Sequence, residues 1–348
     1  MMLLFLKKIN LSLAVLSLFF LLGFVLLPTP LPSAWAAPAE EAQLLEGAKK
    51  EGKLMLYLAG PLEVGLGMLK QFREKYPFVQ TDVYRTGSAA LLTKILAEEQ
   101  AKKYVADVIL VPGGEAMTLK RKDYFAKYVS PQSKFFPEGF KDPEGSWTDV
   151  YLTENGIVYN TKLVTPQEAP HSWKDLLNPK WKGKIGMDSK SYEWFGYMLK
   201  IMGQKNGLEF MQKLGEQNLK FYPTRTLVGQ LVGAGELTMA LVYRGEIEMM
   251  KDQGAPVEWV GVEPIIPSIH PIGIAGHAPH PNAAKLFIDF ALSREGQEGW
   301  ARTYRTPSRP DVKPLRMKKP LKIFTPDFEI IADYQKYGKQ YREILMKK

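Results

Sequence analysis

The stretch that decides the fold is KLMLYLAGPLEVGLGMLKQFREKY, residues 53–76. Its opening run, Lys53 to Ala59, is short and apolar, as is typical of a buried strand, and the apolar residues after it recur at helical spacing. The positions that this spacing predicts on the core side of the helix are Leu62, Leu66, Leu69, Phe72 and Tyr76. Pro77 follows, and because proline cannot continue a helix, the helix is predicted to end there.

The same alternation continues along the chain. A strand at 81–85 leads into a Gly87-Ser88 turn and an amphipathic helix, and a continuous apolar strand follows at 108–111. This βαβαβ order predicts a parallel sheet covered by helices. Ligands of such sheets bind beyond the carboxyl ends of the strands. The turns predicted at that edge are Ala59-Gly60, Gly87-Ser88 and Gly113-Gly114.

A second set of strands and helices begins after residue 159. The strands are predicted at 184–187, 219–222 and 237–243, and the helices at 191–202, 207–217 and 227–233. An extended stretch at 269–275 and a helix at 281–292, with Pro281 at its start, complete the pattern. The C-terminal part is expected to return to the first lobe.

The predicted fold class is therefore α/β with two lobes, each a mostly parallel sheet flanked by helices. A chain of 348 residues exceeds what one ordinary core supports, which also favours two domains. We expect lobe 1 to comprise residues 37–150 together with 275–348, and lobe 2 to comprise residues 151–274.

The N-terminal residues predict export. Lys7 and Lys8 precede an apolar run from Ile9 to Leu27, and Ala34-Trp35-Ala36 has the small-x-small pattern of a cleavage site. We interpret residues 1–36 as a signal peptide and place the protein in the periplasm. An uncleaved membrane anchor is the alternative, because the apolar run approaches the length that spans a bilayer.

Composition excludes several classes of site. The chain has no cysteine, so disulfides, thiolate metal sites and a lipid-modified cysteine are all ruled out. The formal net charge is +9, but lysines and arginines are scattered among acids rather than collected in runs. With no basic motif interleaved with aromatics, we expect no nucleic-acid partner.

Catalytic motifs are scarce as well. The chain has no G-x-S-x-G, P-loop or H-E-x-x-H sequence, so we do not expect an enzyme. His270, His277 and His280 cluster in a stretch rich in proline and glycine, which could suggest a metal site. His277 and His280 precede a helix that begins at proline, so we interpret them as loop and cap residues and expect no metal or cofactor.

Binding is better supported. In Thr86-Gly87-Ser88 the serine starts a helix whose free N–H groups favour an anion, although simple capping explains it equally well. Arg225 starts a helix of the second lobe and could form a forked bond to a carboxylate or phosphate, or be an exposed surface arginine. The complete set of candidate ligand-binding residues is Gly60, Gly87, Ser88, Gly114, Tyr192, Arg225, Thr226, Tyr243 and Arg244.

Four blocks of sequence resemble a known family: Glu154 to Thr161, Ser172 to Leu177, Pro179 to Ile185 and Ala278 to Lys285. They are similar to the extracellular solute-binding proteins of ABC importers, in the iron(III)-type branch with the type II periplasmic-binding fold. The resemblance implies two lobes joined by extended crossovers near 150–160 and 269–275, which close around a solute by a hinge motion. It also implies delivery to an inner-membrane permease with its ATPase. We expect the protein itself to be a monomer.

Ferric members of this family typically hold the metal with adjacent tyrosines at the strand that matches 237–243. Here Tyr243 is followed by Arg244, whose positive charge opposes ferric iron. We therefore expect an anionic organic solute or a metal chelate. Ferric iron remains an alternative, as do a ligand-sensing module and an enzyme on the same fold.

Overall fold

The computed structural model describes residues 36–317 and 320–347. By its internal contacts the chain divides after Glu40, and the unit from Glu41 to Lys348 is described below. The predicted signal peptide lies outside the described residues, apart from Ala36 at the start of helix α1 (Ala36–Glu51). No helix among the described residues has the length and apolarity needed to cross a bilayer.

Lobe 1 is built on three parallel strands in the order β2-β1-β3. They are β1 (Lys53–Leu58), β2 (Gln80–Arg85) and β3 (Val108–Leu110). The helices that follow these strands are α2 (Leu62–Lys75), α3 (Ser88–Gln100) and α4 (Gly113–Lys120), and α9 (Pro281–Leu292) and α10 (Arg294–Ala301) join them from the end of the chain. The predicted βαβαβ order is confirmed.

The buried face of α2 includes the predicted Leu69 and Phe72 but not Leu62 and Leu66. Leu62 and Leu66 are 38% and 44% exposed. The side chains that pack into the core are Val64, Met68, Leu69 and Phe72. Phe72 meets Phe287 of α9 edge to face, with ring centres 5.1 Å apart. The packing of α9 and α10 over α2 fixes which stripe is buried, and the spacing of apolar residues alone did not reveal it.

Lobe 2 repeats the architecture with short strands. These are β5 (Ile185–Asp188), β6 (Lys220–Tyr222), β7 (Met239–Tyr243) and β8 (Val257–Val260). Its helices are α5 (Tyr192–Met202), α6 (Gln204–Gly215), α7 (Arg225–Ala234) and α8 (Arg244–Asp252). Strand β5 pairs in parallel with both β6 and β7.

The C-terminal helices depart from the predicted division. Helix α12 (Tyr334–Leu345) packs against α5 and α6, and the hydroxyl of its buried Tyr341 donates to the carbonyl of Asp188 in lobe 2. Helix α11 (Phe328–Ala332) contacts α4 of lobe 1 and α5 of lobe 2. The expectation that residues 275–348 all return to lobe 1 is therefore wrong for α12, whose apolar face completes the core of lobe 2.

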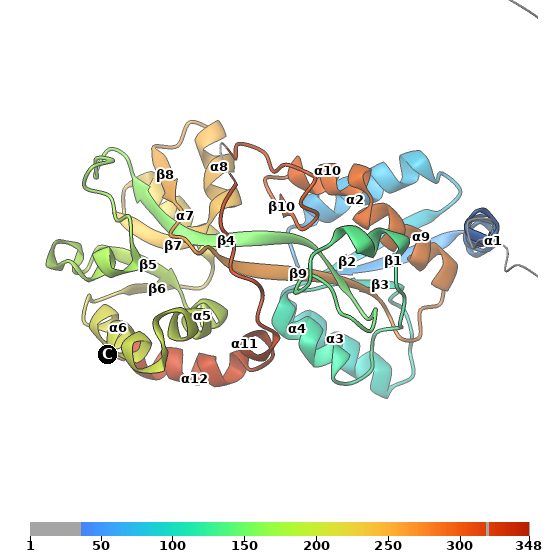
Figure 1. Ribbon diagram of the computed structural model, residues 1–348, viewed down its shortest axis with the longest axis horizontal. Coiled ribbons are helices and arrows are strands. Elements are labelled where there is room, and N and C mark those ends of the chain that lie inside the picture. The colour runs from blue at the N-terminus through green and yellow to red at the C-terminus, as the bar shows by residue number, and fades with distance from the viewer. Residues whose placement is uncertain (1–35, 318–319, 348) are drawn as a thin grey trace, which may run out of the picture. The chain divides into compact units, whose positions relative to one another are not determined.

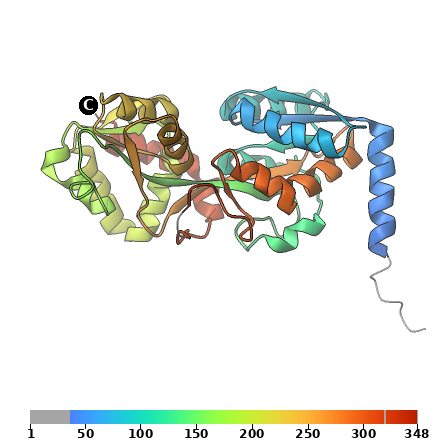
Figure 2. The same ribbon diagram turned by 90° about the horizontal axis from the view of Figure 1, so that it is seen from above.

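Two long strands connect the lobes. Strand β4 (Thr148–Asn160) and strand β9 (Ile266–Ile274) run antiparallel to one another and pass from one lobe into the other (Figures 1 and 2). They lie in the middle of a continuous sheet of order β2-β1-β3-β9-β4-β7-β5-β6, with β8 and the short β10 (Thr306–Pro307) also pairing with β4. The two crossovers predicted from the family resemblance are present.

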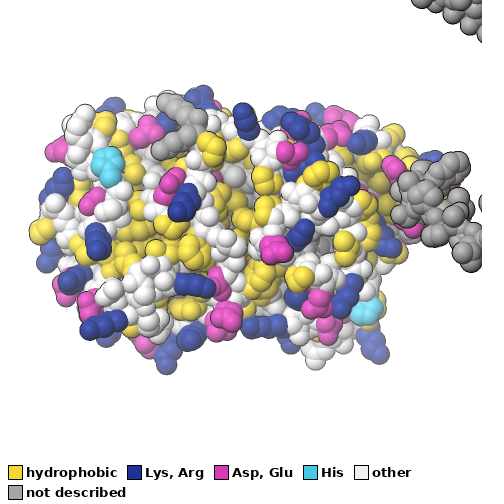
Figure 3. Space-filling model, in the orientation of Figure 1, with side chains coloured by type: hydrophobic (Ala, Val, Ile, Leu, Met, Phe, Trp, Pro, Cys, Tyr) yellow, Lys and Arg dark blue, Asp and Glu magenta, His cyan; other side chains and the backbone are white. Residues whose placement is uncertain are grey.

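Charged side chains are mixed on the face drawn in Figure 3. Lysines and arginines alternate with acids over both lobes rather than forming one basic field. This distribution agrees with the scattered charges of the sequence.

Candidate functional site

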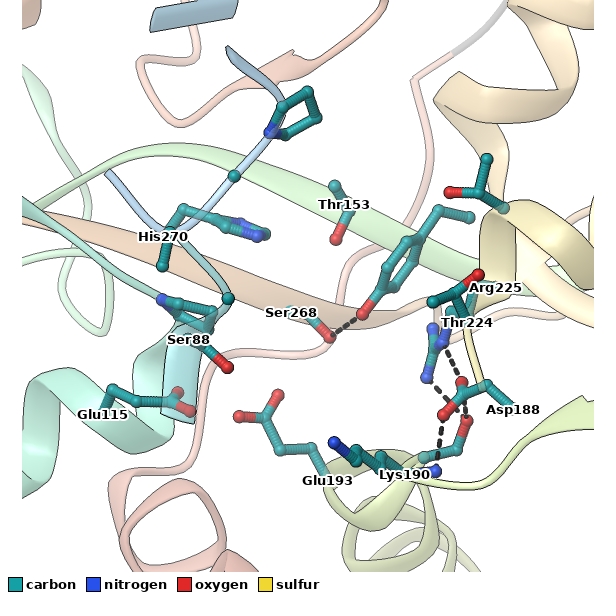
Figure 4. A pocket seen from close by; sticks show the side chains of 18 of the residues that line it. Ser88, Glu115, Thr153, Asp188, Lys190, Glu193, Thr224, Arg225, Ser268 and His270 are labelled. Atoms are coloured by element: carbon teal, nitrogen blue, oxygen red, sulfur yellow. Dashed lines mark hydrogen bonds and ion pairs between the residues drawn. The ribbon is translucent and has the colours of Figure 1, made fainter. Parts of the chain in front are cut away.

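A cavity of about 470 Å³ lies where the two lobes face each other (Figure 4). Lobe 1 lines it with the turns after β1 and β2 and the start of α4, and lobe 2 with the starts of α5, α7 and α8. The crossover strands add Thr153 from β4 and both Ser268 and His270 from β9. Its volume suits a small molecule rather than a polymer.

Several helices begin at this cavity without a side-chain cap. The residues before α2, α3, α5 and α8 make no capping hydrogen bond with their side chains; they are Pro61, Gly87, Ser191 and Tyr243. Helix α7 differs, because the Thr224 hydroxyl accepts a hydrogen bond from the amide of Leu227 at 3.2 Å. Free N–H groups and the positive ends of helix dipoles directed into one cavity favour a bound anion.

Most of the residues predicted from the sequence line the cavity. They are Gly60, Gly87, Ser88, Tyr192, Arg225, Thr226 and Tyr243. The hydroxyl of Tyr192 already accepts a hydrogen bond from Arg342 at 2.7 Å, and Tyr243 lies 3.4 Å from the hydroxyl of Ser268.

Arg225 reaches the cavity with much of its guanidinium already bound. Its Nε donates to Asp188 at 2.5 Å, its Nη2 donates to Ser191 at 2.8 Å, and its Nη1 donates to Asn155. The guanidinium carbon also lies 4.0 Å from the ring centre of Tyr243. The predicted forked bond to one carboxylate is not formed: Arg225 reaches Asp188 through Nε alone, and its other donors are taken by Ser191 and Asn155.

Arg244 does not line this cavity, contrary to the prediction. Its side chain is 3% exposed and donates from Nε to Glu154 at 3.1 Å, from Nη2 to Thr306 at 3.0 Å and from Nη1 to the carbonyl of Leu315 at 3.2 Å. Because these partners lie on the opposite face of β4 from Thr153, Arg244 has a structural role.

Gly114 is also absent from the lining residues. A Cβ added there would lie 2.8 Å from the ring of Tyr334, so the position is closed by packing between α4 and α12. The glycine permits this close approach rather than contacting a ligand.

The sequence analysis missed Arg305, which precedes β10 and lines the cavity. Its side chain is buried, its Nε has no hydrogen-bond partner, and no carboxylate among the described residues lies within 4.0 Å of it. Its charge attracts Glu246 only at longer range, so the guanidinium keeps hydrogen-bonding capacity for an anionic ligand. No local motif marks it as different from the other arginines nearby.

Two further missed residues carry unpaired polar atoms. The Thr153 hydroxyl and Nδ1 of His270 are buried and have no hydrogen-bond partner, and both side chains line the cavity. Figure 4 draws both near the middle of the site. Burial, together with the nearby charge of Arg305, lowers the pKa of His270 to about 3, so its ring is neutral near pH 7.

Three carboxyl groups were missed as well: Glu115, Glu193 and Glu246. Each lies in the first turn of its helix, where a negative charge complements the helix dipole. Burial raises the pKa of all three. The cavity therefore combines cationic and acidic groups.

Tyr243 is the residue that would bind ferric iron if the protein resembled the ferric members of the family. Burial raises its pKa, which opposes the tyrosinate form that ferric iron requires, although the adjacent Arg225 acts in the other direction. Among the described residues no group of three or more His, Cys, Asp or Glu side chains is arranged to hold a metal ion.

Comparison with known proteins gives the family. Residues 103–333, more than half of the chain, match the family described as bacterial extracellular solute-binding protein. The chain belongs to this family. Over 254 residues this solute-binding protein is 24% identical to the putative 2-aminoethylphosphonate-binding periplasmic protein of Salmonella typhimurium, covering 66% of this chain and 70% of that one. Periplasmic relatives of this kind agree with the compartment expected from the sequence.

Solved structures confirm the two-lobed fold. Iron-bound HitA from Pseudomonas aeruginosa superposes with a TM-score of 0.76 at 20% identity, covering 84% of this chain and 99% of that one. The periplasmic binding protein AfuA from Actinobacillus pleuropneumoniae, with fructose-6-phosphate bound, gives a TM-score of 0.73 at 25% identity, covering 85% and 99%. These ligands belong to those proteins.

Proposed function

We propose that this solute-binding protein captures a small organic anion, a phosphonate or phosphate ester, in the cavity between its lobes and delivers it to an ABC permease. The observation that carries the proposal is Arg305, a buried guanidinium that lines the cavity without a carboxylate partner among the described residues. A tetrahedral oxyanion matches the fork of hydrogen-bond donors that arginine presents.

The surroundings of Arg305 support the same ligand class. The hydroxyl of Thr153 can donate to an anionic oxygen, as can His270 in the tautomer that carries its proton on Nδ1. The uncapped helix starts add backbone N–H donors from both lobes. Donors on both lobes explain how an anion would stabilise the closed state.

Relatives support this choice without deciding it. The Salmonella protein is named for a phosphonate, and AfuA holds a sugar phosphate, so oxyanions of phosphorus recur among similar chains. Ferric iron is also represented, in HitA and in the Fe(3+)-binding periplasmic protein of Serratia marcescens. Tyr243 has no tyrosine next to it in the sequence, and its raised pKa makes unchelated iron the weaker candidate here.

Calorimetric titration of the purified protein tests the proposal. The probes are 2-aminoethylphosphonate, ethylphosphonate, fructose 6-phosphate, acetate and ferric ion supplied without a chelator. We expect binding of at least one phosphorus oxyanion at one site per chain, and native mass spectrometry should detect the same class of molecule retained by freshly purified protein. Tight binding of ferric ion with tyrosinate absorbance, and of no oxyanion, would overturn it.

Export and processing belong to the same proposal. We infer that the chain is cleaved after Ala36 and released into the periplasm, on the basis of the basic, apolar and small-residue order at its N-terminus. N-terminal sequencing of protein recovered from the periplasm of an expressing bacterium should begin at residue 37 or 38. A chain that keeps its first residues and sediments with membranes would support the anchor instead.

A further inference from the structure

Two carboxyl groups face the same part of the cavity from opposite lobes. Glu115 comes from the first turn of α4 in lobe 1, and Glu193 from the first turn of α5 in lobe 2. Figure 4 shows both side chains directed toward one another below Ser88. Two acids placed in this way repel each other when both are ionised, unless a cation lies between them.

Lys190 lines the same cavity and its charge acts on Glu115, but it forms no ion pair with either acid. Neither carboxylate lies within 4.0 Å of a lysine, arginine or histidine nitrogen among the described residues. Arg225, whose charge acts on Glu193, is bound to Asp188 and Asn155 instead. The two acids therefore face each other without a directly paired cation among the described residues, and Lys190 acts only from beyond 4.0 Å.

The electrostatics of the pair agree with this arrangement. Burial, followed by repulsion from Glu115, raises the pKa of Glu193 to about 7, with smaller opposing contributions from Arg225, Ser268 and the backbone of Gly114. Burial also raises the pKa of Glu115, opposed by a hydrogen bond from Ser88 and by the charge of Lys190. The other titratable groups that act on these acids are the tyrosines Tyr197, Tyr243 and Tyr334, all with raised pKa values and so neutral near pH 7.

The helix dipole does not explain the pair by itself. A glutamate in the first turn complements the helix dipole equally well when it points into solvent. Glu63, in the first turn of α2, is exposed in this way and does not line the cavity. Glu115 is instead 7% exposed and aimed at the other lobe. Its position costs desolvation that the dipole alone does not require.

A second observation at the same cavity points to a ligand. Thr153 is 4% exposed, yet its hydroxyl has no partner and Figure 4 shows it directed into the space above Glu193. Because buried hydroxyls are normally hydrogen-bonded, this one indicates a missing polar guest. Thr153, the two acids and Arg305 all line this one cavity.

We propose that Glu115 and Glu193 together bind an ammonium group of the solute, so that the protein selects a zwitterion whose anionic end lies toward Arg305 and the crossover strands. This inference rests on the proposed capture of an oxyanion and assigns the opposite end of the same ligand. Since one acid comes from each lobe, the bound ammonium links the lobes and favours their closure.

The test compares two ligands that differ only in the amine. Titration of 2-aminoethylphosphonate and of ethylphosphonate into the same protein at about pH 8 should show a preference of about tenfold or more for the amine. At about pH 6 the preference should shrink, because a group with a pKa of about 7 is then largely protonated and no longer attracts a cation.

Variants locate the effect. Glu193→Gln and Glu115→Gln should each remove most of the preference while leaving the affinity for ethylphosphonate unchanged or improved. Glu209→Gln, at an exposed position of α6, is the matched control and should keep it. Because the readout is a ratio between two ligands in one folded protein, a general loss of stability does not imitate the expected result. If a variant does not fold, the two-ligand comparison in the unaltered protein still decides.

The outcomes separate this inference from the proposed function. Equal affinity for both phosphonates, or a preference that survives both substitutions, overturns the ammonium site and leaves oxyanion capture standing. Binding of ethylenediamine without binding of either phosphonate supports the acid pair and overturns oxyanion capture. Binding of neither phosphonate nor ethylenediamine overturns both.

Discussion

The two faces of crossover strand β4 differ in whether their buried polar groups have hydrogen-bond partners. Glu154 points away from the cavity, and its carboxylate accepts hydrogen bonds from Arg244 and from Thr306. Thr153, one residue earlier, faces the cavity and has no partner. Since successive side chains of a strand point to opposite faces, one residue separates a satisfied structural network from an unsatisfied binding surface.

Strand β10, which pairs with this part of β4, also has one polar residue with hydrogen-bond partners next to one without. Thr306 belongs to the satisfied network, whereas the preceding Arg305 lines the cavity with an unpaired Nε. Arg244 and Arg305 are therefore both buried arginines, but only the first has a carboxylate within 4.0 Å among the described residues. The comparison predicts that the first arginine stabilises the fold and that the second binds the solute.

The largest expected effect is the loss of the satisfied network. Arg244→Ala should lower the free energy of unfolding by about 3–5 kcal/mol, because Glu154 is then left buried without its counter-ion. Urea denaturation measures this change. The control is Arg302→Ala, at an arginine that is exposed. A loss below about 1 kcal/mol would mean that the Arg244–Glu154 pair contributes no more than an exposed ion pair does.

Arg305→Met should have a smaller effect of a different kind. Affinity for the oxyanion should fall by about 2 kcal/mol or more, because the substitution removes the guanidinium that the oxyanion is proposed to bind. Among the described residues that guanidinium is buried and has no carboxylate within 4.0 Å. The stability of the ligand-free protein should change less than in Arg244→Ala, because Arg305 has no carboxylate within 4.0 Å among the described residues and attracts Glu246 only at longer range. Unchanged affinity, measured by calorimetry beside Arg302→Met, would remove Arg305 from the site.

Thr153→Val sharpens the contrast with the smallest expected change. The substitution removes an unpaired buried hydroxyl, so the ligand-free protein should become slightly more stable, while affinity for the solute falls by about 1 kcal/mol. Opposite signs for stability and affinity identify a group that is kept for binding. Loss of both together would mean that the hydroxyl supports the fold instead.

Much of the architecture was predictable from the sequence. Apolar runs alternating with helical spacing predicted the βαβ order, and the turns at Gly60 and Gly87, expected at the carboxyl edge of the sheet, line the cavity. These features depend on local patterns of one or two elements. The placement of α12 against lobe 2 depends on which core has an uncovered face, and that information is distributed over the whole chain.

The site was predictable only in part, for a related reason. Arg225, Arg244 and Arg305 look alike in sequence. They differ only in three dimensions: Arg225 and Arg305 line the cavity, whereas Arg244 binds Glu154 on the opposite face of β4. Alternation along the crossovers could have suggested Thr153 and His270 once both strands were known to line a cleft. Glu115 and Glu193 face each other from the two lobes, a relation that no local spacing contains.

Amide hydrogen exchange, with and without bound 2-aminoethylphosphonate, tests most directly whether a solute occupies the space between the lobes. The account predicts slower exchange at the helix starts near residues 87–91, 191–195 and 225–229, on both lobes at once. Protection limited to one lobe, or found only around the separate cavity beside Trp259, would contradict it.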